Sequence, residues 1–173
     1  MVTRILDLAV LLLLAFAILM PRPNAKVKPA LAAGPAERDR VAELQARLFA
    51  TPGDGGAALE LADIFMDGRR ADWALAVLQP AIEASPADHR LFLRRALALA
   101  DHFEAAAAYQ AAARALALCE AGGAVRCDDT EHSRIALVER TLARVKHIDM
   151  RKDPNAAKEQ ILKALRPAYL PKR

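Results

Sequence analysis

The most regular feature of the sequence is the spacing of its apolar residues, which follows the period of an α-helix over much of the chain. After position 55, apolar residues recur three and four positions apart on both sides of a break at Asp67 and Gly68. Helical spacing interrupted by glycine predicts two helices joined by a turn. The same spacing predicts further helices at 36–50 and 130–147. We therefore expect an all-α protein.

Composition supports this fold class. Hydrophobic residues make up 54% of the chain but aromatic residues only 5%, because the excess is alanine and leucine. Both form helices readily, and alanine lets neighbouring helices approach closely.

The N-terminal segment Ile5–Met20 is apolar apart from Asp7 and ends at Pro21. A helix of this length reaches about 24 Å, somewhat less than the roughly 30 Å hydrocarbon core of a bilayer. The nearest Ala-x-Ala sequence begins only at Ala30, which disfavours a cleaved signal peptide. We predict an uncleaved, single transmembrane helix within residues 1–21, with a cleaved signal peptide as the alternative.

The remaining chain divides into a linker and a domain. Residues 22–35 are rich in proline and alanine and are predicted to form an extended tether. Residues 36–173 are long enough for one helical domain of three to four hairpins.

The predicted hairpin over residues 55–88 carries small and apolar residues at fixed spacings. Ala62 precedes Phe65 by three positions, and Pro86 closes the unit. The second helix adds Ala74, Leu78 and Ala81. This pattern resembles a tetratricopeptide repeat, a helical hairpin that buries its apolar face against neighbouring hairpins.

Two later segments repeat the pattern. In residues 89–118, Ala105, Tyr109 and Ala112 follow the spacing of the first unit thirty-one positions later, which implies a short preceding helix or a compressed turn. A looser third hairpin is predicted over 130–167. Its second helix has Asp153 as N-cap, Pro154 as first residue, and the matching residues Ala157, Ile161 and Ala164.

The resemblance implies a binding surface, because in this family the first helices of successive hairpins line a concave groove that binds a protein or peptide. The implied contact residues come from two units and are Asp63, Met66, Asp67, Arg90, Leu93 and Leu97. The lysine and asparagine pattern with which some members bind a C-terminal carboxylate is missing, so that mode is not predicted.

Cys119 and Cys127 are the only cysteines and flank a loop that contains glycine. Their spacing leaves two alternatives open, a disulfide or two reduced thiols. An oxidised cysteine pair favours export, and so does the apolar N-terminal segment, which resembles a bacterial membrane anchor. The domain is therefore predicted on the periplasmic side of a membrane. The positive-inside rule slightly favours the cytoplasmic side, since Arg22, Lys26 and Lys28 follow the apolar segment.

Signatures of several enzyme classes are missing from the sequence. It has no phosphate-binding glycine loop, no dinucleotide fingerprint and no His-Glu-x-x-His motif. Zinc-type ligands gather in one stretch, namely Cys119, Cys127, Asp128, Asp129, Glu131 and His132, but a Cys-x7-Cys spacing is not typical of a structural zinc site. We predict no catalytic residues, no metal and no cofactor.

These observations predict a membrane-anchored protein interaction module, an adaptor or assembly factor. The alternative is an accessory structural subunit of a larger membrane protein complex. Nucleic acid is not an expected partner, because a single aromatic residue, Tyr169, lies among the basic residues that follow Arg140.

Overall fold

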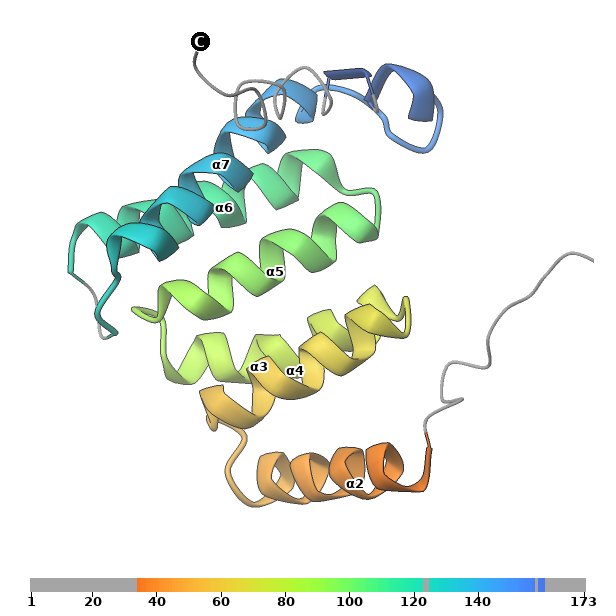
Figure 1. The fold of residues 1–173 in the computed structure, drawn as a ribbon, viewed down its shortest axis with the longest axis vertical. Coiled ribbons are helices and arrows are strands. Elements are labelled where there is room, and N and C mark those ends of the chain that lie inside the picture. Colours follow the sequence, from red (N-terminus) through yellow and green to blue (C-terminus); the bar gives the residue numbers. More distant parts are fainter. Residues whose placement is uncertain (1–33, 123–124, 158, 161–173) are drawn as a thin grey trace, which may run out of the picture.

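The computed structural model describes residues 34–122, 125–157 and 159–160, and the regular secondary structure of these residues is helical (Figure 1). The all-α prediction is confirmed. The longer helices are α2 (Pro35–Ala50), α3 (Gly55–Asp67), α4 (Ala71–Ala84), α5 (His89–Asp101), α6 (Ala105–Glu120) and α7 (Asp129–Val145).

Within the described ranges, no helix is both long and apolar enough to cross a membrane. The segment 5–20, which carries the predicted transmembrane helix, lies outside those ranges, as does most of the tether. The anchor therefore remains a prediction from the sequence.

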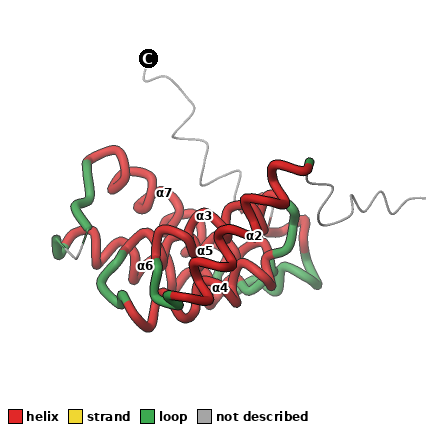
Figure 2. The backbone as a smooth tube through the Cα atoms, turned by 90° about the horizontal axis from the view of Figure 1, so that it is seen from below, coloured by secondary structure: helices red, strands yellow, loops and turns green. Residues whose placement is uncertain are grey.

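Each helix packs on the next one along the chain, and α3 also contacts α5. Figures 1 and 2 show α3 and α7 on one face of the molecule and α4 and α6 on the other. Consecutive helices thus form hairpins that stack side by side. This arrangement places the N-terminal turns of α5 and α7 next to each other, where His89 and Glu131 lie 3.1 Å apart.

Small residues allow the close packing within each hairpin. Ala62 of α3 and Ala74 of α4 are fully buried, as the sequence pattern predicts, and so is Leu78. One apolar cluster joins α2, α3, α4 and α5, and a second joins α5, α6 and α7. Each hairpin therefore buries its apolar face against its neighbours rather than alone.

The turns inside the first two hairpins share one backbone conformation. Arg69, between α3 and α4, has φ 57°, and Phe103, which lies 34 positions later between α5 and α6, has φ 66°. Equivalent hydrogen bonds close both turns: the Arg70 amide donates to the Phe65 carbonyl at 2.7 Å, and the Glu104 amide donates to the Leu99 carbonyl at 2.8 Å.

The helix starts repeat with the same period. Asp54 caps α3 by accepting a hydrogen bond from the Ala57 amide at 3.0 Å. Asp88, again 34 positions later, caps α5 by accepting from the Arg90 amide at 3.0 Å. A carboxylate at this position satisfies an amide that the helix leaves unpaired.

The period of 34 corrects the thirty-one-residue spacing expected from the sequence. The structural equivalents of Ala74, Leu78 and Ala81 are Ala108, Ala112 and Ala115, all fully buried, whereas Tyr109 is partly exposed. The prediction of a short first helix is wrong, because α3 and α5 both have 13 residues. Alanine is so frequent in α6 that the apolar pattern fits more than one register.

The third hairpin departs from this period. A longer α6 and the loop that follows it delay the N-cap of α7 to Asp128, which lies 40 positions after Asp88. The predicted start of the next helix is confirmed, because Asp153 accepts a hydrogen bond from the Ala156 amide at 2.9 Å. Ile161 and Ala164 lie outside the described residues.

Gly53 is required where the turn between α2 and α3 passes the end of α4. A Cβ atom built on Gly53 would lie 2.6 Å from the Ala84 Cβ atom, too close for both to keep their places. We expect Gly53→Ala to lower the free energy of unfolding by about 1–3 kcal/mol. Urea unfolding would measure this loss. Gly34→Ala is the control, because a Cβ atom there meets nothing within 4 Å, and equal losses in both variants would contradict the explanation.

Candidate functional site

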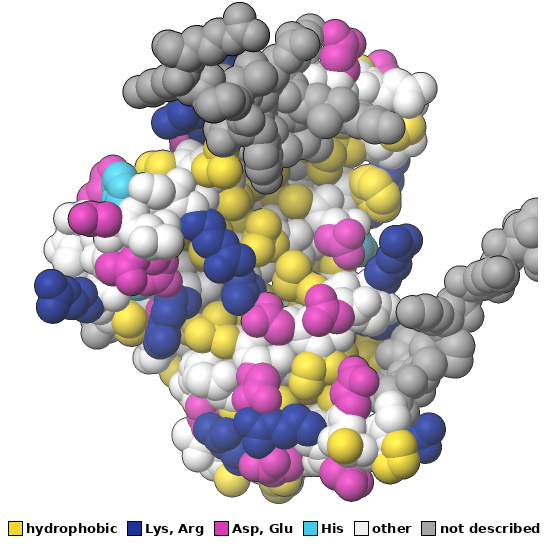
Figure 3. Space-filling model, in the orientation of Figure 1, with side chains coloured by type: hydrophobic (Ala, Val, Ile, Leu, Met, Phe, Trp, Pro, Cys, Tyr) yellow, Lys and Arg dark blue, Asp and Glu magenta, His cyan; other side chains and the backbone are white. Residues whose placement is uncertain are grey.

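A hollow of about 300 Å³ lies between α3, α5 and the first turns of α7. Its lining residues are Leu59, Arg90, Leu93, Arg94, Asp128, Thr130, Glu131 and Arg134. Figure 3 shows acidic and basic side chains interspersed on this face, with no large patch of one sign. The hollow is therefore mixed in charge, with apolar residues at its floor.

Capping carboxylates position two sides of the hollow. Asp88 starts α5, and Asp128 starts α7 by accepting a hydrogen bond from the Glu131 amide at 2.7 Å. Leu93 is only 4% exposed and packs with Ile135 of α7. The same packing that buries Leu93 therefore draws α7 against α5 and forms the hollow.

Most charged groups of the hollow have partners within the protein. The Arg94 Nη2 donates to Asp63 Oδ2 at 3.0 Å, which joins α5 to α3. The Arg90 guanidinium pairs with Asp88 at 2.8 Å. Among the described residues, Arg134 is exposed and has no hydrogen-bonded or ionic partner. Its charge is available to a bound molecule.

The Asp88 carboxylate carries the most informative pKa shift near the hollow. Burial raises its pKa, but hydrogen bonds from the Arg90 side chain and amide lower it more strongly, so the net pKa lies below its ordinary value. Asp88 is 5% exposed, whereas the side chain of its partner Arg90 is 42% exposed. The ion pair therefore holds a largely buried carboxylate in its charged form.

We expect Asp88 to contribute to stability only while it is charged. Because its folded pKa is lowered, this contribution is present above the unfolded pKa, about 3.9, and is lost as the pH falls through the folded pKa. Asp88→Asn should therefore lose less stability than the wild type between about pH 5 and pH 2. Urea midpoints across this range provide the measurement. An unchanged slope in Asp88→Asn would contradict the prediction.

The structure places the six predicted contact residues unequally. Arg90 and Leu93 line the hollow, and Asp63 borders it through its pair with Arg94. Three do not line it: Asp67 is exposed at the end of α3, Met66 packs against the first apolar cluster, and Leu97 is half-buried. Met66 and Asp67 end α3, and Leu97 lies on a later turn of α5 than the residues that line the hollow.

Sequence reasoning missed much of the lining, including Leu59, Thr130 and Arg134. Leu59 precedes Leu93 by 34 positions, so the correct period would have found it. No comparable signal indicates Thr130 and Arg134, because the irregular loop before α7 removes the period. Arg94, which lines the hollow as well, forms the link between α3 and α5.

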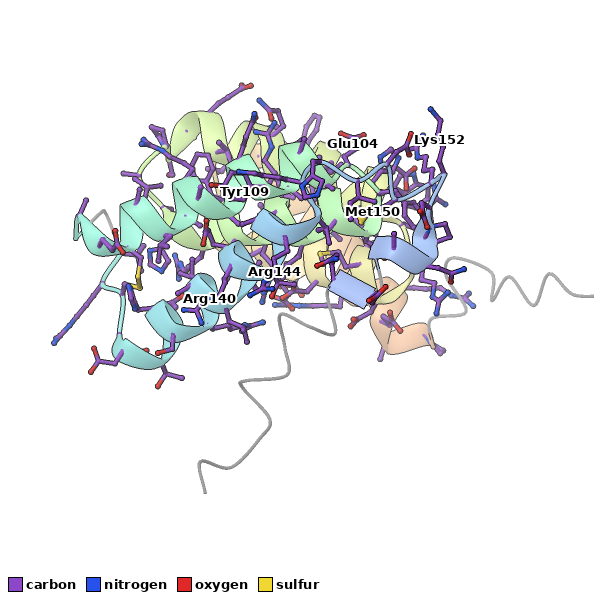
Figure 4. All side chains as sticks on the ribbon, turned by 90° about the horizontal axis from the view of Figure 1, so that it is seen from above. Glu104, Tyr109, Arg140, Arg144, Met150 and Lys152 are labelled. Atoms are coloured by element: carbon purple, nitrogen blue, oxygen red, sulfur yellow. A yellow bond between two sulfur atoms is a disulfide. The ribbon has the colours of Figure 1, made fainter. Side chains whose placement is uncertain are left out.

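A disulfide joins Cys119 at the end of α6 to Cys127 just before α7 (Figure 4). Of the two alternatives left open by the sequence, the structure contains the bridged form. Close to Cys127 lie the buried ring of His89 and the carboxylate of Glu131. The bridge thus lies next to the first turn of α7, and this turn lines the hollow.

A larger hollow, about 670 Å³, lies at the opposite ends of these helices. It is bordered by residues of the two equivalent turns, such as Arg69 and Phe103, and by the segment from Met150 to Pro154. It contains none of the predicted contact residues. We therefore treat the smaller hollow, which lies between three helices and contains the exposed cation Arg134, as the candidate site.

Comparisons of this chain with family models, with curated proteins and with solved structures find no match. Arguments about function therefore rest on the residues and geometry described above.

Proposed function

We propose that the protein is a membrane-anchored interaction module of the tetratricopeptide type, whose helical hairpins hold a protein or peptide. The observation that carries this proposal is the hollow between α3, α5 and α7, in which Arg134, without a partner among the described residues, lies beside the apolar Leu59 and Leu93. Apolar floors with a few oriented polar groups are typical of binding sites.

The repeat geometry supports the choice of class. Equivalent turns and equivalent N-caps recur with a period of 34 residues, the length of a tetratricopeptide repeat. Proteins built from such repeats bind partners along the face formed by the first helix of each hairpin. In this chain those helices are α3, α5 and α7, and all three contribute to the hollow.

Charge specifies the partner further. Arg90 and Arg94 already pair with acids, so Arg134 is the cation of the described lining that is left for a bound segment. We propose that the partner presents an acidic residue to Arg134 and an apolar side chain to Leu59. The predicted N-terminal anchor would keep this partner close to a bilayer, and the Cys119–Cys127 bridge supports a location on the exported side.

Reversal of one charge tests this proposal. We expect Arg134→Glu to reduce co-purification of the partner from gently solubilised membranes by about tenfold or more. The reason is that the new glutamate would face the acidic residue of the partner, and two like charges facing each other in an interface cost several kcal/mol. Arg140→Glu is a matched control, since Arg140 lies on the same helix but outside the hollow (Figure 4). Equal recovery with both variants and the wild type would argue against the hollow as the binding site.

The alternative is an accessory subunit of a larger membrane complex, and one observation favours it. Phe49, at the end of α2, is 93% exposed, and a neighbouring chain of a larger complex would cover its ring. For an accessory subunit, Phe49→Ser would release the protein from its complex, whereas an adaptor would keep its partner.

A further inference from the structure

Three potential metal ligands from distant parts of the sequence meet behind the first turn of α7. They are His89 at the start of α5, Cys127 before α7, and Glu131 within α7. One ligand atom of each lies within 4.8 Å of the other two. The sequence alone did not bring His89 into this group, because it lies 38 positions before Cys127.

The state of His89 is unusual for a buried polar residue. Its side chain is fully buried, and neither ring nitrogen has a hydrogen-bond partner among the residues that the structure describes. Nε2 lies 3.1 Å from Glu131 Oε1, but without the alignment of a hydrogen bond. Buried polar atoms are nearly always satisfied, so an unsatisfied imidazole beside a carboxylate and a sulfur is suited to binding a ligand.

In the bridged protein this ligand set is incomplete, because Cys127 is bonded to Cys119 and a disulfide sulfur has no thiolate charge. A dithiol reductant would change this. Its two thiols pass two electrons and two protons to the bridge and form a disulfide of their own, while the Cys119–Cys127 bond breaks into two thiols. Both sulfurs are then free beside His89 and Glu131.

We propose that the reduced protein binds one Zn²⁺ ion through Cys127, His89 and Glu131, with Cys119 as the fourth ligand. Thiolate, imidazole and carboxylate are the ligands that zinc prefers, and zinc sites are usually tetrahedral. Ligand atoms in such a site lie about 3.3–3.8 Å apart. His89 Nε2 and Glu131 Oε1, at 3.1 Å, are already close to this range, whereas the distances to Cys127, which are within 4.8 Å, need to close by up to roughly 1 Å. The two sulfurs must move apart once the bridge is reduced. Zinc binding releases the thiol protons to solvent as the thiolates form.

This site would make the start of α7 sensitive to redox conditions. In the oxidised protein the disulfide holds the end of α6 to the residue before α7, and in the reduced protein the metal would take over that role. The proposal departs from the sequence prediction of no metal. It does not depend on whether the hollow binds a protein partner.

Zinc titration of the full-length chain in detergent tests the proposal. The protein is reduced with dithiothreitol, desalted without oxygen, and titrated with Zn²⁺ against a chromogenic chelator. We expect one bound zinc per reduced chain and none per oxidised chain. Cobalt in place of zinc should give the near-ultraviolet absorption of thiolate coordination.

Matched variants identify the ligands. We expect His89→Gln and Glu131→Gln each to weaken zinc binding by about tenfold or more. His132→Gln, a substitution of a neighbouring histidine on α7 outside the cluster, should bind like the wild type. Because His89 is buried, circular dichroism must show that each variant is folded. If His89→Gln does not fold, Glu131→Gln still tests the proposal, because Glu131 is partly exposed. Equal binding by reduced and oxidised chains, or equal losses in the His132 and Glu131 variants, would overturn the proposal.

Discussion

Leu78→Ala is expected to lower the free energy of unfolding by about 3 kcal/mol, within the usual range of about 2–5 kcal/mol for such substitutions. Leu78 is fully buried on α4 and belongs to the apolar cluster that joins the first four described helices. Alanines in this cluster already hold the neighbouring helices close together. The helices therefore have little room to move inward and fill the space that the leucine side chain leaves. The loss therefore combines removed apolar contact with a remaining cavity.

Chemical denaturation of the full-length protein would measure this loss. Gln79→Ala is the matched control, because Gln79 is the next residue of the same helix and is exposed, with one hydrogen bond to Glu83. We expect the control to change stability by no more than about 0.5 kcal/mol. Similar small effects at both positions would show that α4 does not pack into a shared core.

Removal of the disulfide is expected to cost about 2–3 kcal/mol, because the bridge closes a short loop and limits the freedom of the unfolded chain. The variant that combines Cys119→Ser and Cys127→Ser should unfold at a lower urea concentration than the oxidised wild type. The reduced, metal-free wild type should match the variant, and added reductant should not affect the variant. If the double variant and the oxidised wild type shared one midpoint, the bridge would contribute nothing to stability.

Much of the fold was accessible from the sequence because local signals agree with the tertiary packing. The break at Gly68 separates α3 from α4, and the expected helix at 36–50 corresponds to α2 within one residue. Asp153 and Pro154 mark a helix start, as predicted. Caps and breaks depend on short-range interactions, which a single sequence displays directly.

The register of the second hairpin was not accessible from apolar pattern alone. α6 begins with four alanines, so several alignments place small residues at the required spacing. The true period is evident from polar and turn positions, since Asp54 and Asp88 both cap helices and Arg69 and Phe103 share one backbone conformation. Capping residues are more specific markers than alanine, because only a few side chains can accept the terminal hydrogen bond.

The candidate site was predicted in part. Its lining residues Arg90 and Leu93 on α5 were expected from the resemblance to a tetratricopeptide repeat, whereas its contribution from α7 depends on the loop that ends at Cys127. The length and path of that loop have no counterpart in the first two hairpins. The meeting of His89 with Glu131 is a consequence of this irregular connection, and no periodic argument would reveal it.

Site-specific photo-crosslinking tests the central claim most directly, because it reports which face contacts a partner in the cell. A photoreactive amino acid replaces Thr130, which is exposed and lines the hollow, or Gln110, which is exposed on α6. Full-length protein is irradiated in intact cells, and the adducts are identified by mass. The proposed function predicts a specific protein adduct from position 130 and none of the same partner from position 110. Adducts with that partner only from position 110, or equally from both positions, would contradict a partner bound in the hollow.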